Sequence, residues 1–171
     1  MNIKLSLLAI VEILSGLSIG IVIMIITYKI LKWIGRKKYD IHEKNLAYSI
    51  FMSSVLFAVG FMVSGVIQPL LSLFRIMAAS ESSTAALLFS FIGYGAFYIA
   101  SSYTAGVVVS LVGITIYTGL TPIDEFAELK NNNLGVALIV GTIIIVLTLL
   151  PRDGINLLME SQIPYPTHFT Q

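Results

Sequence analysis

One carboxylate, Glu12, stands inside the first long apolar stretch of the chain, which runs from Leu7 to Leu31. A charged side chain at the centre of a membrane-spanning helix costs about 2.5–3.5 kcal/mol on insertion scales. Such a carboxylate is therefore protonated, faces a polar interior or lies near the membrane surface. Two interpretations stay open for Glu12: a proton- or cation-binding role, and a structural or interfacial position close to the start of its helix.

Hydroxyl groups make the third apolar stretch unusually polar, and they are the candidates to hydrogen-bond Glu12. The possible ion or proton site therefore combines Glu12 with Tyr94, Tyr98 and Ser101. The alternative is ordinary hydrogen bonding between helices, worth about 0.6 kcal/mol per pair on average. We favour this alternative.

Small residues recur at helical spacing in the first and third apolar stretches. Gly16 and Gly20 lie on one face of the first helix, and Ser102, Gly106 and Ser110 form a similar stripe in the third. Small side chains let helix backbones approach closely in lipid. We expect these two helices to pack on their stripes, within a chain or between chains.

Asparagines stand directly before two apolar stretches, Asn45 before the second and Asn131, Asn132 and Asn133 before the fourth. Asparagine caps a helix because its side-chain oxygen accepts from a free backbone N–H. The alternative is a cytoplasmic contact surface for a partner or lipid headgroups, which would include Asp124 and Glu128. Threonine, proline and acids at 121–125 predict a short interfacial helix from Pro122 to Lys130.

Several kinds of chemistry lack the residues they need. The chain has no cysteine, and His42 and His168 are isolated, so we expect no metal site. Phosphate-binding glycine loops, Ser-His-Asp sets and paired acids are also absent from the sequence. A net charge of +1 gives no field that would attract nucleic acid. The sequence predicts a non-enzymatic protein with no cofactor and no nucleic-acid partner.

The elements that position these residues are long apolar segments. Hydrophobic residues make up 57% of the chain and charged residues 11%, against about 25% charged in soluble domains. A bilayer core of about 30 Å needs about 20 helical residues. Because none of the segments alternates as barrel strands do, we predict an all-α integral membrane fold with four transmembrane helices. The spans are expected at about 7–31, 46–70, 93–119 and 134–150, with the residues before Gly93 outside the bilayer.

The charges and a weak internal repeat predict the topology. Lysines and arginines gather between Lys29 and Lys44, so the positive-inside rule places this loop in the cytoplasm and both termini outside. A shift that aligns Asn45-Leu46 with Asn133-Leu134 overlays the two halves of the chain. The sequence therefore predicts two tandem helical hairpins in parallel repeat, 1–80 and 85–163, followed by a short tail, 164–171.

Both junctions resemble those of a known family. Thr121 to Glu125, Glu128 to Asn133, and then Gly135, Ala137 and Gly141 are similar to the second half of the YjfL-like proteins. Asp40 to Asn45, followed by Ala47, resembles the first-half junction. This family consists of small prokaryotic inner-membrane proteins classed under a domain of unknown function, 350. The resemblance implies a duplicated two-helix unit in the plasma membrane, no established reaction and a membrane-maintenance role.

Two functions from different classes follow. The first is a non-enzymatic assembly or envelope-maintenance component in contact with the lipid bilayer, which acts as a homo-oligomer or with a membrane-protein partner. The second is a small oligomeric channel or transporter for protons or small cations that uses Glu12.

Overall fold

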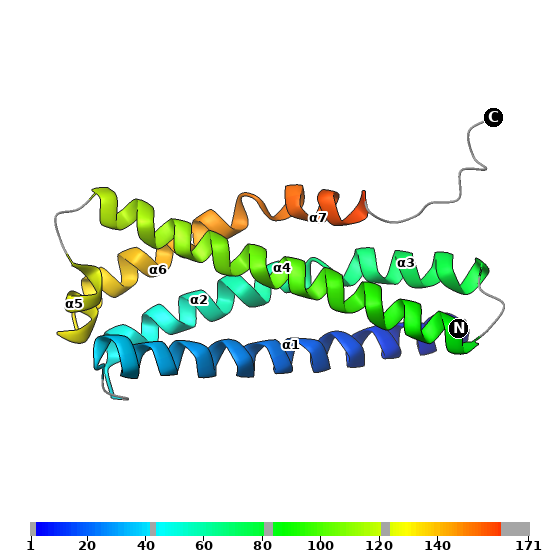
Figure 1. Cartoon of the computed structure of the whole chain (residues 1–171), viewed down its shortest axis with the longest axis horizontal. Helices are drawn as coiled ribbons and strands as arrows, with labels where there is room; N and C mark the ends of the chain where they lie inside the picture. The colour runs from blue at the N-terminus through cyan, green and yellow to red at the C-terminus, as the bar shows by residue number, and fades with distance from the viewer. Residues whose placement is uncertain (1–2, 42–43, 81–83, 121–123, 162–171) are drawn as a thin grey trace.

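The structure is a computed structural model that describes residues 3–41, 44–80, 84–120 and 124–161. These residues form seven α-helices and no strand, so the expectation of an all-helical fold is confirmed for this part of the chain (Figure 1). In chain order the helices are α1 (Ile3–Tyr39), α2 (Leu46–Ser64), α3 (Ile67–Ser80), α4 (Thr84–Leu120), α5 (Glu125–Lys130), α6 (Leu134–Leu149) and α7 (Arg152–Glu160).

Four helical segments in the described ranges are long and apolar enough to cross a membrane. They are Gly16–Tyr39, Leu46–Phe74, Phe89–Ile116 and Leu134–Glu160. Each overlaps one of the four expected spans, and the first lies further along the chain than the expected 7–31. The residues before Gly93, which we expect to lie outside the bilayer, belong to α4, which continues through them as one uninterrupted helix.

The core of the bundle lies around α2, whose most extensive packing is against α6. α4 and α1 also pack on α2, and both run nearly the full length of the molecule in Figure 1. α2 is apolar all round, and a helix of that kind belongs in the interior. Small residues allow the close approach of α2 and α6, since Ala47, Ala58 and Ala137 are fully buried and a Cβ at Gly141 would strike the Ser54 side chain.

The second long helix of each half is interrupted. α2 ends in a tight turn in which the Val66 N–H donates to the Val63 carbonyl, and α3 begins immediately afterwards. A Cβ at Gly65 would collide with the Asn156 side chain of α7, so this break is also a place of close packing. α6 ends before Pro151, whose ring cannot continue a helix. Beyond the two breaks, α3 and α7 share a small second core with α4.

Candidate functional site

Asn45 joins the two junctions at one end of the bundle, which we call the basic end because Arg36, Lys37 and Lys38 lie there at the last turn of α1. Its side-chain oxygen accepts from the Tyr48 N–H at 2.7 Å and caps α2, as the sequence predicts. Its side-chain amide donates to the carbonyl oxygens of Leu129 at 2.7 Å and Lys130 at 3.0 Å.

A side chain of the second junction also bonds to the first junction. The side-chain oxygen of Asn132 accepts from the Ala47 N–H at 3.0 Å. Asn133 caps α6 by accepting from the Gly135 N–H at 3.1 Å, and its amide donates to Glu128 at 2.7 Å. The predicted N-caps at Asn45 and Asn133 are therefore confirmed. The contacts of Asn45 and Asn132 join the two junctions within the chain.

The short helix of the second junction begins later than the sequence suggests. Asp124 caps α5 by accepting from the Ala127 N–H at 3.1 Å, and the helix runs from Glu125 to Lys130 rather than from Pro122. Residues 121–123 lie outside the described residues. Asn131, the third asparagine, ends α5 and is exposed. Asp124 and Glu128 thus serve the local structure of the junction.

Aromatic rings close the basic end between α1 and α5. The Tyr39 ring stacks on Phe126 with a centroid separation of 4.0 Å and an interplanar angle of 4°, and Phe51 meets Phe126 edge-on at 5.9 Å. The Tyr48 hydroxyl donates to the Leu31 carbonyl at 2.6 Å. Its ring fills the space that a Cβ at Gly35 would need, so α1 and α2 are in close contact here.

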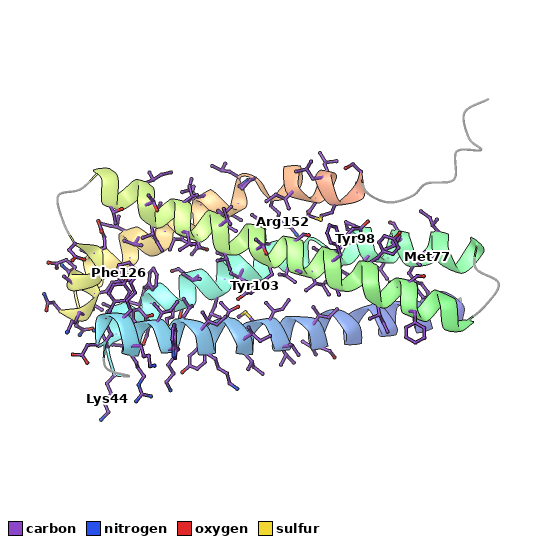
Figure 2. The ribbon with its side chains drawn as sticks, in the orientation of Figure 1. Lys44, Met77, Tyr98, Tyr103, Phe126 and Arg152 are labelled. Carbon is purple, nitrogen blue, oxygen red and sulfur yellow. The ribbon has the colours of Figure 1, made fainter. Side chains whose placement is uncertain are left out.

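An elongated cavity of about 440 Å³ lies behind these rings, between α1, α2 and α4. We call it the α1–α4 crevice. Its walls combine aliphatic side chains, among them Ile30, Ile34 and Val107, with aromatic rings that include Tyr39 and Tyr103. Lys38 is the charged residue among the described ones that line it. Figure 2 shows Phe126 and Lys44 at this end of the bundle. Sequence reasoning missed the crevice because its walls come from four separate helices.

The structure describes the three hydroxyl residues of the possible ion or proton site but not the Glu12 side chain, so this site stays a prediction. Tyr98 is buried, with 1% exposure, among Val66, Leu73 and Met77 of the second core (Figure 2). Tyr94 is 42% exposed, and Ser101 is half-buried. The Glu12 side chain lies outside the described residues. No group of three or more potential metal ligands occurs in the part of the chain that was placed.

The small-residue stripe of α4 packs on α2, so the expectation that it meets the first helix within the chain is wrong. The Ser102 hydroxyl donates to the Met62 carbonyl at 2.8 Å. A Cβ at Gly106 would lie 3.2 Å from the Val59 Cα, and the Ser110 hydroxyl donates to the carbonyl of Gly106 in its own helix at 2.8 Å. The small-residue stripe thus predicts correctly which face of α4 packs, but it does not predict that the neighbouring helix is the apolar α2.

The glycines of α1 have different surroundings. A Cβ at Gly16 would lie 3.1 Å from the Ile67 Cδ1 of α3, whereas a Cβ at Gly20 would have no neighbour within 4 Å. Both glycines line an open groove of about 890 Å³ on the outer side of α1, with Ile13, Leu17 and Ile67. We call it the α1 groove.

Near the middle of the bundle, Arg152 begins α7 with its guanidinium carbon 4.2 Å from the centroid of the Phe61 ring on α2 (Figure 2). This contact is visible in the sequence only as a charge that ends the fourth apolar stretch. An arginine stacked on an aromatic ring keeps its apolar stem in the packing and its charge against the ring face. The Arg152–Phe61 contact holds the start of α7 against α2 beside the break at Gly65.

Together, four long apolar helices around a common core have the length and composition expected of a multi-pass membrane protein. The chain belongs to the family described as Domain of Unknown Function (DUF350), whose model matches residues 5–155. The resemblance seen at the two junctions is thereby confirmed. No curated protein and no solved structure is significantly similar to the chain.

Proposed function

We propose that the protein is a non-enzymatic component of the prokaryotic plasma membrane that works by self-association, with α1 as its assembly helix. The observation that supports this proposal is the uneven packing of the spans. In the most apolar window of α1 11% of the residues are buried, against 50% in the span that contains α2. A second copy of the chain would give α1 the packing that its own chain does not supply.

The α1 groove offers a place for such a contact. Because lipid tails are as apolar as aliphatic side chains, helix association in membranes depends on close van der Waals packing at small residues. At Gly20 another helix could approach α1 closely, because an added Cβ there would have no atom of this chain within 4 Å. Leu17 and Ile13, both more than 60% exposed, flank it as apolar contact surface.

The orientation in this proposal follows from the basic end. Lys29, Lys32, Arg36, Lys37 and Lys38 all belong to the second half of α1. The positive-inside rule puts this end in the cytoplasm and the two termini outside. A tandem duplication is part of the proposal too: α1 and α4 each have 37 residues, and each precedes an interrupted helix.

One observation favours the alternative function, an oligomeric channel or transporter for protons or small cations that uses Glu12. Interrupted helices in corresponding places of two repeats are typical of transporter binding sites. The breaks at Gly65 and Pro151 occupy such places. Loss of proton flux into liposomes on Glu12→Gln would support this alternative over assembly alone.

The assembly proposal is tested by cross-linking in nanodiscs and liposomes. The chain has no cysteine, so Leu17→Cys alone should form a disulfide-linked dimer under oxidation. Adding Gly20→Leu should abolish that dimer, whereas Gly93→Leu, on α4, should not. A Cβ at either glycine would meet nothing within 4 Å, and the unfolding temperature of each variant shows whether the rest of the leucine side chain is accommodated. A Leu17→Cys chain that stays monomeric at every protein-to-lipid ratio would refute the proposal.

A further inference from the structure

The α1–α4 crevice exists because its two outer helices lean on other partners. α1 packs mainly on α2, and α4 packs on α2 and α6. The space left between them is about 440 Å³, within the range of about 300–1,000 Å³ typical of ligand pockets. It lies away from the α1 groove, so the inference drawn from it is independent of self-association.

The shape of the crevice restricts what can fill it. Its α1 wall runs from Thr27 to Lys38, which is about 16 Å at the helical rise. A volume of about 440 Å³ over this length leaves a cross-section of about 27 Å². A helix with its side chains is about 10–12 Å across. The crevice therefore has room for one extended hydrocarbon chain and not for a helix of another copy.

The threonine and serine hydroxyls in the walls of the crevice are already bonded and are not available to a polar occupant. Thr27 donates to the Ile23 carbonyl at 2.8 Å and Ser110 to the Gly106 carbonyl at 2.8 Å, each within its own helix. The Thr115 hydroxyl is bound in the same way to Leu111 at 2.9 Å. Apolar cavities of this kind hold apolar ligands rather than water. The chemistry of the walls fits a saturated or unsaturated acyl chain.

The charge at the mouth of the crevice identifies the headgroup. Lys38 lines the crevice and is exposed, with its Nζ 5.2 Å from the centroid of the Tyr39 ring that closes the end. Lys37, the next residue, is exposed as well. Lysines that flank a membrane-spanning helix attract anionic lipid headgroups. A largely apolar crevice that opens beside a lysine is complementary to an acyl chain attached to a phosphate.

We propose that the α1–α4 crevice binds one anionic phospholipid, with an acyl chain between α1 and α4 and its phosphate at Lys38. The lipid replaces the missing direct packing between the two helices. Its contact is selective, because a zwitterionic headgroup carries no net negative charge for Lys38.

Native mass spectrometry of the full chain tests this proposal in detergent, where the orientation in the membrane does not matter. Delipidated protein titrated with phosphatidylglycerol should retain one molecule at activation energies that remove phosphatidylcholine. Lys38→Gln should weaken the retained binding about five-fold. Lys44→Gln removes the same charge from the same end of the bundle, outside the crevice lining, and should leave the affinity unchanged.

A second variant tests the acyl-chain half of the site. Val107→Phe places a larger side chain in the crevice and should prevent retention, while glycerol phosphate should not compete with the lipid. A parallel thermal unfolding curve shows whether this variant folds, and Leu111→Trp at the exposed edge serves if it does not. Several outcomes would overturn the proposal. One is an equal loss of lipid affinity in Lys38→Gln and Lys44→Gln, and another is full competition by glycerol phosphate. Unchanged lipid binding in a folded variant with a filled crevice, or a second copy of the chain cross-linked through the crevice, would overturn it as well.

Discussion

The side-chain amide of Asn45 lies 2.7 Å from the carbonyl oxygen of Leu129, so the residue that begins α2 also holds the end of α5. The same side chain supplies the oxygen that caps α2. Asn132 completes the connection in the opposite direction through the Ala47 N–H. Two junctions far apart in the sequence are thus fixed to one another by backbone groups that helix ends leave free.

Replacing Asn45 should separate its two roles. Asn45→Ser keeps a capping oxygen but cannot reach Leu129, so it should lose two hydrogen bonds worth about 0.5–1.5 kcal/mol each. Asn45→Ala should lose the cap as well, about 1 kcal/mol more. At about 2–4 °C per kcal/mol, thermal unfolding in detergent should rank the parent above Ser and Ser above Ala. Asn131→Ala is the control, and a serine variant as stable as the parent would contradict the cross-junction contribution.

Gly106 should tolerate no added methyl group, because its α2 neighbour is backbone. A Cβ there would lie 3.2 Å from the Val59 Cα, and overpacking of this kind costs about 1–3 kcal/mol. Gly106→Ala should therefore lower the unfolding temperature. Gly93→Ala in the same helix meets nothing within 4 Å and should be neutral or slightly stabilising. Equal unfolding temperatures for the two variants would show that α4 does not press on α2 at this point.

Asp40 should be sensitive to backbone shape more than to charge. Its φ is 50°, a left-handed conformation that β-branched residues resist. Its ion pair with Lys130 at 3.3 Å is exposed and contributes little. Asp40→Val should lower the unfolding temperature, whereas Asp40→Gly, which also loses the charge, should not. Two equally destabilised variants would mean that the ion pair decides the stability.

The proposed topology can be checked by labelling single cysteines in a chain that has none of its own. Cysteines at Lys44 and Lys130 should be protected from an impermeant maleimide added to intact spheroplasts and should react after lysis. A cysteine at Ser161 should react in intact spheroplasts. Labelling of all three positions from one side would contradict the four-span arrangement.

The spans and caps could be predicted from the sequence because their signals are local. Each apolar stretch carries its own length, and Asn45 and Asn133 stand directly before apolar runs. The break at Gly65 gave no comparable signal, since Ser64 and Gly65 lie within an uncharged run and Gly65 keeps an ordinary helical conformation. Pro151, by contrast, marks its break by its ring geometry.

The partners of each helix could not be predicted in the same way. Ser102 and Gly106 mark the packing face of α4, but α2 is apolar on every side and therefore carries no stripe that would identify it as their partner. The contacts of Asn45 and Asn132 join positions that only the folded chain brings together. The α1–α4 crevice depends on how far α1 and α4 diverge, and no spacing of residues within either helix encodes that divergence.

The pairing of α2 with α6 has a consequence for biosynthesis. During synthesis α2 leaves the ribosome well before α6 has been made. In the proposed membrane protein, α2 is therefore in contact with lipid before its principal neighbour, α6, is present. A chain that stops short of Leu134 leaves that surface uncovered, and one that stops short of Leu129 also leaves Asn45 without its partners in the second junction. A product truncated before α6 would therefore expose this surface of α2 to quality-control proteases.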